Sequence, residues 1–336
     1  MIQTIQTGMG PFRRPRRAHA KLVAMLTYFQ ATVIGAVQGV TELFPISSLG
    51  HSVLVAAWLG GDWQDLVTES ESTTRTPYLA FVVALHVGTA VALLAHYRRD
   101  WIAIVTGLLS TVRTGRLDTV SQRLAILILI ATVPVAILGP LLQHPLHVLF
   151  AAPLCAATFL VCNGVALIIG EGLRRRNEPS LAEYGRRFAL QQHRTGIHTA
   201  AVPPRRQSDR PLAALGFGDA LGIGAAQVGA LLTGFSRAGL TIVGGLWRGL
   251  EHEHAAKFAF LLATPAILGA GILQIPELIG PETAGIRGPV LVGAVVSGLS
   301  SWLAVRFLER YFQTRTLLPF AVYCVVVGIF SIIRFA

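Results

Sequence analysis

Residues 38–51 of the chain read QGVTELFPISSLGH. This stretch places the carboxylate of Glu42, the hydroxyls of Ser47 and Ser48 and the imidazole of His51 inside a segment that is otherwise apolar. An ionised carboxylate at membrane depth is costly in free energy and by default marks a functional site. The stretch therefore predicts a polar site enclosed by hydrophobic helices.

A second stretch repeats this pattern 189 positions later, as the step from Ser47 to Ser236 shows. The counterpart of Ser48 in this alignment is Arg237, so a hydroxyl in one half of the chain corresponds to a cation in the other. We expect one site built from two related hairpins. Aligned without a gap, the identical or similar pairs are Gly35/Gly224, Ala36/Ala225, Gln38/Gln227, Ser47/Ser236, Gly50/Gly239 and Ser52/Thr241.

Composition indicates a polytopic membrane protein. Of 336 residues, 53% are hydrophobic and only 13% are charged, and apolar runs long enough to cross a hydrocarbon core of about 30 Å recur. The alternative, a soluble all-α protein, does not account for runs of this length. The segment 101–112 is too short to span and is expected at an interface or inside the bundle. The predicted spans are 78–97, 124–142, 148–170, 256–275, 288–306 and 316–335.

The net charge of +11 does not indicate nucleic-acid binding, because no aromatic and basic surface accompanies it. The arginines gather in alternate inter-helix segments, which is the positive-inside pattern and predicts that those segments are cytoplasmic. The clusters are Arg98, Arg99, Arg113, Arg116 and Arg123, then nine arginines between Arg174 and Arg210, then Arg306, Arg310 and Arg315.

Two apolar stretches, about 22–60 and 212–250, are interrupted near their middle by Gly, Pro and Ser. If the arginine-rich segments are cytoplasmic, each of these stretches must enter and leave the membrane on the same side. We therefore interpret them as two re-entrant helix-loop-helix hairpins, inserted from opposite faces of the membrane. We therefore predict an all-α fold of six transmembrane helices plus two re-entrant hairpins in an inverted repeat. The predicted units are a basic extension (1–24), a first repeat (25–172), a cytoplasmic linker (173–211) and a second repeat (212–336). The basic extension conflicts with this topology: either Met25 is the true start, or the first hairpin is less re-entrant.

Four side chains are the candidates for chemistry. Glu42 can act as a base, Ser48 as a nucleophile near a helix N-terminus, and His51, three residues later, as a proton carrier. The guanidinium of Arg237 suits phosphate oxygens. A purely structural Glu42–Arg237 pair is the competing interpretation, and Ser47 is expected mainly to cap a helix. The set describes phosphoryl chemistry better than proton or sugar transport.

Other polar residues in the apolar segments have weaker functional interpretations. His252 and His254 suggest a metal site, but we favour a solvated connection. His86 lies in a span, where the neighbouring Gly88 indicates packing near the pocket, and Asp219 is either a helix cap or a second polar wall. The cysteines, namely Cys155, Cys162 and Cys324, are interpreted as small buried hydrophobes.

The two motifs resemble those of the undecaprenyl-pyrophosphate phosphatases of the bacitracin-resistance type. That family carries E-G-x-T-E-x-x-P-x-S-S-x-G-H in its first half and P-G-x-S-R-S-G-x-T in its second. Here they read QGVTELFPISSLGH (38–51) and TGFSRAGLT (233–241). The segment 258–271 is also similar, and the resemblance runs from about Met25 to the C-terminus. Three positions depart from the family pattern: Gln38 replaces an acid, Thr233 a proline and Ala238 a serine.

The resemblance implies an enzyme of the bacterial inner membrane that removes the terminal phosphate of undecaprenyl pyrophosphate. This reaction regenerates the lipid carrier for cell-wall precursors and confers bacitracin resistance. The implied catalytic residues are Glu42, Ser48, His51 and Arg237. A divalent cation, Mg²⁺ or Ca²⁺, is compatible with Glu42 as its ligand, and no organic cofactor is expected. The substrate-binding positions would be Gln38, Ser47, Gly234, Ser236, Gly239 and Thr241.

Two alternatives stay open from the sequence. One is a lipid-phosphate transporter that uses the same inverted repeat for alternating access, and the other is a catalytically weakened paralogue that binds lipid without turnover. The three departures from the motifs are what keeps the second alternative open. The expected partners are the polyprenyl pyrophosphate lipid and the membrane. The oligomeric state is left open, with a homodimer as one option.

Overall fold

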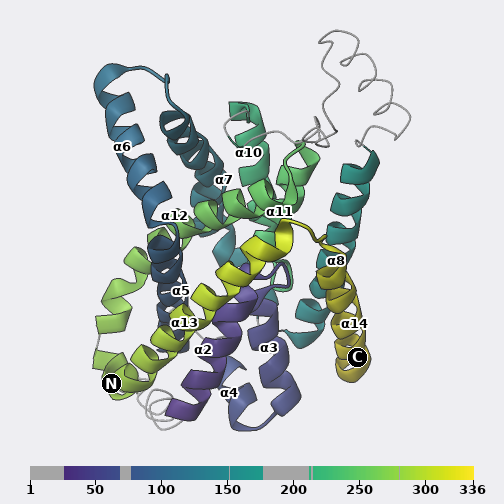
Figure 1. Cartoon of the computed structure of the whole chain (residues 1–336). Coiled ribbons are helices and arrows are strands. Elements are labelled where there is room, and N and C mark those ends of the chain that lie inside the picture. The colour runs from purple at the N-terminus through teal and green to yellow at the C-terminus, as the bar shows by residue number, and fades with distance from the viewer. Residues whose placement is uncertain (1–25, 69–76, 151, 177–211, 213–214, 280) are drawn as a thin grey trace, which may run out of the picture.

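The computed structural model describes residues 26–68, 77–150, 152–176, 212, 215–279 and 281–336, and this part of the chain is built from helices (Figure 1). The predicted extension 1–24 and nearly all of the predicted linker 173–211 lie outside the described residues. The principal helices are α2 (Tyr28–Leu43), α3 (Ser48–Leu59), α4 (Asp62–Thr68), α5 (Pro77–His96), α6 (Arg98–Thr114), α7 (Val120–Phe150), α8 (Pro153–Arg176), α10 (Phe217–Ala226), α11 (Arg237–Trp247), α12 (His252–Ile279), α13 (Arg287–Phe312) and α14 (Leu318–Phe335).

Among the described residues, five helices are long and apolar enough to cross a membrane, namely Val120–Leu142, Pro153–Arg175, His252–Ile272, Thr283–Phe312 and Leu318–Phe335. They confirm five of the predicted spans. The sixth predicted span, 78–97, coincides with α5. This helix forms a bent pair with α6, the two axes meeting at 86°. The chain is thus a multi-pass membrane protein whose described residues are helical and hold five or six candidate spans.

The first hairpin is shaped by local sequence signals. The Thr27 hydroxyl accepts the Gln30 N–H in a capping box that starts α2. Pro45 ends that helix, because its ring disfavours helical backbone at the preceding residue, and Phe44 is extended at φ −65° and ψ 140°. Ser47 then caps α3, its hydroxyl accepting the Gly50 N–H at 3.2 Å.

The second hairpin repeats this arrangement. The Ser236 hydroxyl accepts the Gly239 N–H at 3.1 Å and caps α11, as Ser47 caps α3. One turn further on, the Thr241 hydroxyl donates to the Arg237 carbonyl at 2.8 Å, and its aligned partner Ser52 donates to the Ser48 carbonyl at 3.1 Å. Two of the residue pairs matched in the sequence, Ser47/Ser236 and Ser52/Thr241, therefore make the same local hydrogen bonds.

Each hairpin packs against a helix from the other half of the chain: α2 lies along α13, and α10 lies along α7. Glycines permit these close approaches. A Cβ added to Gly35 would collide with the Gly293 carbonyl, and one added to Gly224 would collide with the Ala131 carbonyl. Small residues at helix contacts are typical of membrane bundles, where close backbone packing replaces the hydrophobic effect.

The tips of the two hairpins meet. A Cβ placed on Gly50 would lie 3.1 Å from the Gly234 Cα, and one on Gly239 would lie 3.3 Å from the Pro45 Cβ. In Figure 1, α2 and α3 occupy the lower half of the view and α10 the upper half. The two loops thus form one polar centre between helices of both halves.

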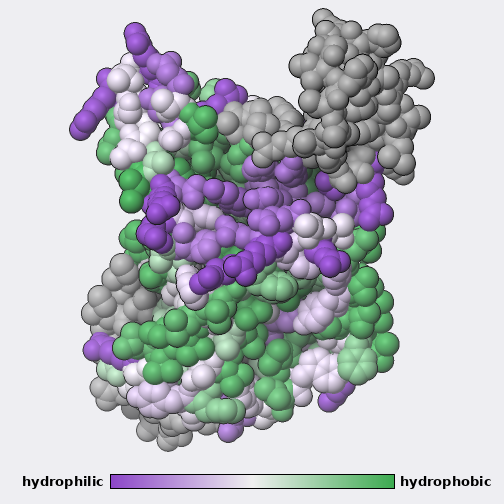
Figure 2. All heavy atoms as spheres, in the orientation of Figure 1, coloured by the Kyte–Doolittle hydropathy of each residue, from purple (hydrophilic) through white to green (hydrophobic). Residues whose placement is uncertain are grey.

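Apolar side chains cover the lower part of the face seen in Figure 2, with a hydrophilic band above them. The surface of α13 and α14 is strongly apolar, with Leu303 62% and Ile333 74% exposed, as expected for helices in lipid. Cys162 also lies on an exposed helix surface, so the prediction that all three cysteines are buried is wrong for this residue. Cys155 is half-buried and only Cys324 is fully buried. The error arises because a spanning helix turns one apolar face to lipid.

Candidate active site

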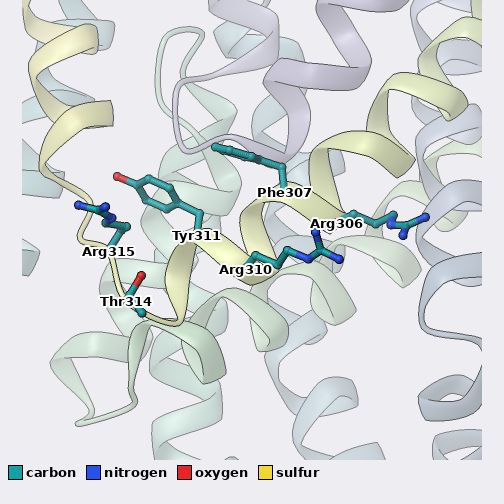
Figure 3. A pocket seen from close by; sticks show the side chains of 6 residues that line it. All are labelled: Arg306, Phe307, Arg310, Tyr311, Thr314 and Arg315. Atoms are coloured by element: carbon teal, nitrogen blue, oxygen red, sulfur yellow. The ribbon is translucent and has the colours of Figure 1, made fainter.

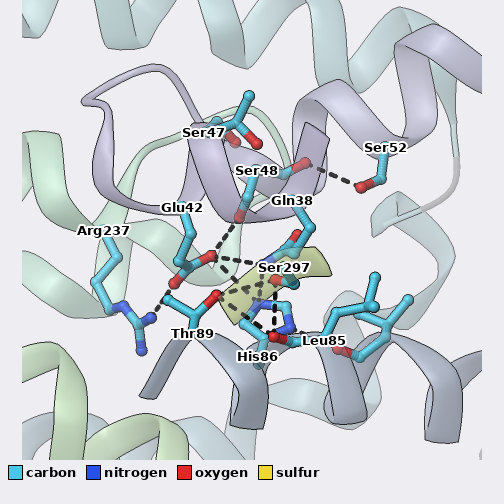
Figure 4. Close-up of polar contacts among 12 residues, drawn as sticks. Gln38, Glu42, Ser47, Ser48, Ser52, Leu85, His86, Thr89, Arg237 and Ser297 are labelled. Carbon is cyan, nitrogen blue, oxygen red and sulfur yellow. Dashed lines mark hydrogen bonds and ion pairs between the residues drawn. The ribbon is translucent and has the colours of Figure 1, made fainter. Parts of the chain in front are cut away.

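Glu42 lies at the centre of a polar network (Figure 4). One carboxylate oxygen, Oε2, accepts the Ser48 hydroxyl at 2.5 Å and the Gln38 amide at 3.0 Å. The other, Oε1, pairs with the Arg237 guanidinium. Glu42 is only 8% exposed. The network brings together four of the residues predicted for the site, and it joins residues that are 195 positions apart in the sequence.

Ser48 is the first residue of α3 and is directed toward the carboxylate. Its hydroxyl donates to Glu42, so the serine oxygen keeps its lone pairs for another partner. A carboxylate in this position can take the proton when the oxygen attacks an electrophile. The unpaired N–H groups of the first turn also favour an anion near Ser48. The pair has the geometry of a nucleophile and its base.

Arg237 occupies the equivalent first position of α11. Its side chain is 22% exposed, compared with 4% for that of Glu42, so it forms the open side of the pair. Among the described residues, its one hydrogen-bond partner is Glu42, through Nη2. A guanidinium carries five N–H donors. The remaining donors can therefore hold phosphate oxygens beside Ser48.

His86 of α5 belongs to the same network, although the predicted site residues did not include it. Its Nδ1 lies 2.8 Å from the Val82 carbonyl, which can only accept, so Nδ1 carries a proton. Its Nε2 lies 3.1 Å from Gln38 Nε2 and 3.3 Å from Glu42 Oε2. The imidazole therefore contacts both the Glu42 carboxylate and Gln38, the residue that replaces an acid in the first motif.

His51 forms hydrogen bonds with residues other than Ser48. Its Nδ1 lies 2.7 Å from the Ser47 carbonyl and its Nε2 lies 2.9 Å from the Tyr323 hydroxyl. The ring also stacks on Tyr323, with centroids 5.6 Å apart and planes at 10°. Because the Ser47 carbonyl fixes the proton on Nδ1, Nε2 accepts from the tyrosine. In this arrangement His51 joins α3 to α14.

The remaining predicted binding residues shape the two loops. Ser47 and Ser236 are each 2% exposed and cap their helices, and Thr241 bonds within α11. Gly234 has a φ of +114°, and an added Cβ would lie 2.7 Å from the Phe159 side chain. These residues fix the backbone around Ser48 and Arg237 and, apart from Gln38, do not join the Glu42 network.

Asn163 of α8 connects the two loops. Its side-chain amide donates to the Pro45 carbonyl at 2.9 Å, and its Oδ1 accepts the Ser236 N–H at 3.0 Å. The residue is fully buried. Its role was not predicted from the sequence, although a lone Asn in an apolar span is the kind of signal that marks a functional role.

Several polar residues outside this network also have polar partners. Asp219 caps α10 by accepting the Gly216 N–H at 3.0 Å and pairs with Arg248. His252 is buried and lies 2.8 Å from Glu171 Oε2, so the predicted solvated connection is wrong at this residue. The error has a physical reason: a carboxylate on α8, 81 positions away, provides a partner that the local sequence does not reveal.

The donor set does not favour a resident metal. Among the described residues no group of three or more His, Cys, Asp and Glu side chains could hold a cation. Glu42 offers one carboxylate, and one of its oxygens already faces the Arg237 cation. Mg²⁺ and Ca²⁺ require six or more oxygen ligands. Most of the ligands would have to come from outside the protein.

Comparison with known proteins gives consistent matches over nearly the whole chain. The family model described as bacitracin resistance protein BacA matches residues 31–330. Undecaprenyl-diphosphatase from Mycolicibacterium paratuberculosis is 52% identical, covering 94% of this chain and 99% of its own. Undecaprenyl-diphosphatase 2 from Frankia alni is 49% identical, covering 93% and 98%. Undecaprenyl-diphosphatase from Acidiphilium cryptum is 41% identical, covering 92% and 98%.

Proposed function

Because the chain belongs to the family of the bacitracin resistance protein BacA, we propose that it is an undecaprenyl-diphosphatase. It hydrolyses the lipid diphosphate to the monophosphate and inorganic phosphate, which recycles the carrier for cell-wall synthesis and confers bacitracin resistance. The observation that carries this proposal is the convergence of Ser48 and Arg237, from different halves of the chain, on the buried carboxylate of Glu42.

In the proposed first step, the Ser48 oxygen attacks the terminal phosphorus while Glu42 accepts the hydroxyl proton. The bond from phosphorus to the bridging oxygen breaks, and undecaprenyl monophosphate leaves with that oxygen. Arg237 donates N–H groups to the phosphoryl oxygens and offsets the charge that develops on them. Water then attacks the phosphoserine, the proton on Glu42 returns to Ser48, and inorganic phosphate is released.

The neighbouring histidines have separate roles in this proposal. His86 supports Glu42 through Gln38, which stands where the family's first motif has its second acid, and by direct contact. His51 positions α3 through Ser47 and Tyr323. No step is assigned to a divalent cation, because Glu42 is a single carboxylate that is already paired with an arginine.

Phosphate release from undecaprenyl diphosphate by the purified protein in detergent tests the function. We expect turnover by the wild-type protein and none by Glu42→Gln. A lipid transporter would bind and move the substrate without releasing phosphate, and a weakened paralogue would bind it without turnover. Binding with no release in the wild-type protein would therefore refute the proposal and favour one of these alternatives.

The topology proposed with this function is an inverted repeat of six spans and two re-entrant hairpins in the bacterial inner membrane. The equivalent caps of Ser47 and Ser236 and the contact of the hairpin tips support it. Cysteines introduced at Asp62 and Arg116, in a protein without its three native cysteines, should react with an impermeant reagent from opposite sides. Labelling of both from one side would overturn the inverted repeat.

A further inference from the structure

A pocket of about 510 Å³ lies at the C-terminal end of α13, and none of its lining residues belongs to the Glu42 network (Figure 3). The helix is a candidate span that ends at Phe312, so the pocket is situated where this helix leaves the apolar region. Three arginines, two aromatic residues and a hydroxyl form its walls. The lining residues are Arg306, Phe307, Arg310, Tyr311, Thr314 and Arg315.

The three arginines of this pocket have no anionic partner in the described part of the chain. Arg237 and Arg248, by contrast, each pair with a carboxylate. Arg306 instead lies over the Trp302 ring, 4.5 Å from its centroid, and Figure 3 shows Arg306 and Arg310 extending from the same side of α13. The like charges of the three guanidinium groups favour an anion in the pocket. The pocket thus has the charge and the donors for phosphate oxygens.

A stripe of exposed apolar side chains on α13 leads to the pocket. Its members recur every four residues and so form a row that winds around the helix: Leu291, Val295, Leu299 and Leu303, which are 53–65% exposed. Phe307 continues the stripe into the pocket and is 52% exposed. An apolar track that ends at arginines matches a lipid, whose chains would follow the stripe and whose phosphate would reach the guanidinium groups.

The pocket also contacts the loop of the proposed active site. The Phe307 ring stacks on Phe44, with centroids 5.9 Å apart and planes at 3°. Phe44 follows the helix that carries Glu42, and its carbonyl accepts the Ser236 hydroxyl at 3.4 Å. Phe307 is therefore shared between the pocket wall and the support of the catalytic loop.

We propose that this arginine pocket binds the phosphate headgroup of an anionic membrane lipid. The site is separate from the proposed phosphatase centre, because it shares no residue with the Glu42 network. Its ligand chemistry is a phosphate group, which a phospholipid or free phosphate could provide, and the apolar stripe favours the phospholipid. Bilayer-facing basic residues typically contribute about 1 kcal/mol each to the attraction of anionic lipids, which is roughly a fivefold preference per residue.

Trp302 beside Arg306 provides a direct reporter of lipid contact. Trp58, Trp63, Trp101 and Trp247 would be replaced by Phe, and the protein reconstituted in phosphatidylcholine vesicles. Brominated phosphatidylglycerol and brominated phosphatidylcholine would then be compared as quenchers at equal mole fraction. We expect the phosphatidylglycerol to quench Trp302 more strongly. The triple substitution of Arg306, Arg310 and Arg315 by Gln should bring the ratio of the two effects close to one.

A matched triple variant, with Arg98, Arg113 and Arg116 changed to Gln, loses the same charge elsewhere and should keep the preference. Arg310→Gln alone should lower the preference for phosphatidylglycerol over phosphatidylcholine severalfold. This single variant keeps the proposal testable if the triple variant of the pocket does not fold. Inorganic phosphate, added at increasing concentration, distinguishes a pocket for the phospholipid headgroup from a pocket for free phosphate. Equal quenching by both lipids, an unchanged preference in Arg310→Gln, or full displacement by phosphate would overturn the lipid proposal.

Discussion

Replacing Asn163 by Leu should slow turnover sharply, although the residue is not expected to touch the substrate. The substitution nearly preserves volume but removes both hydrogen bonds that join the loops, leaving the Pro45 carbonyl and the Ser236 N–H without their partner. A buried polar backbone group without a partner costs about 1–3 kcal/mol. The two together therefore destabilise the closed arrangement of the loops by about 2–6 kcal/mol.

Part of this loss is offset, because Ser236 still contacts the Phe44 carbonyl and Arg237 still pairs with Glu42. We therefore use the lower end of the range. Since 1.4 kcal/mol corresponds to a factor of ten in rate, kcat should fall on the order of 10- to 100-fold, with a smaller change in KM. Phosphate release from undecaprenyl diphosphate provides both constants.

Two controls separate positioning from general damage to the fold. Cys324→Ala removes two weak sulfur contacts, one to the same Pro45 carbonyl at 3.9 Å and one from the Asn163 amide at 3.4 Å, but keeps both bonds that join the loops, so kcat should be nearly unchanged. In a His86→Gln protein, which should keep part of its turnover, Asn163→Leu should cause a smaller further loss than in the wild-type protein, because both changes act on the geometry around Glu42. A kcat within threefold of wild type for Asn163→Leu would refute the bridging role.

Four further substitutions test the site itself, each measured by phosphate release from the purified, folded protein. Arg237→Lys should lose most of the turnover while still inserting in the membrane, because Lys keeps the charge and loses the planar fork; near wild-type rates would remove Arg237 from the site. Ser48→Ala should nearly abolish hydrolysis, whereas Ser47→Ala should cost about 0.5–2 kcal/mol of stability as a lost cap and less activity. If Ser48→Ala stays active, a positioned water replaces the covalent route. His86→Gln should lower kcat and alter the pH–rate profile, because it removes the ring that faces Glu42, and an unchanged profile would exclude this role.

The sequence predicted the parts of the molecule that depend on local signals. Pro45 and the serines that follow it mark the end of one helix and the start of another, and these are short-range effects of ring geometry and capping. The repeat of the first motif around Ser236 and Arg237 predicted that two distant segments share one site. The pairing of Arg237 with Glu42 follows from the same reasoning, because a guanidinium deep in a bilayer needs an anion.

The residues that the sequence did not reveal act across helices. Asn163 and Tyr323 each lie in an apolar span without a neighbouring polar motif, and their partners are 118 and 272 positions away. His86 was noted but not assigned, since its contact with Glu42 depends on how α5 packs beside α2. The 86° bend between α5 and α6 is also a tertiary effect. Local periodicity carries no information on such contacts.

The packing of each hairpin on the opposite half explains why these contacts matter for catalysis. Gly35 of the first hairpin is held against Gly293 of the second half, and Gly224 of the second hairpin against Ala131 of the first. The position of each hairpin loop therefore depends on a helix from the other half of the chain. The carboxylate of Glu42 needs donors from both halves to remain charged in the bilayer, so the contacts that assemble the fold also create the base. A mutation that loosens either hairpin should then lower activity before it unfolds the protein.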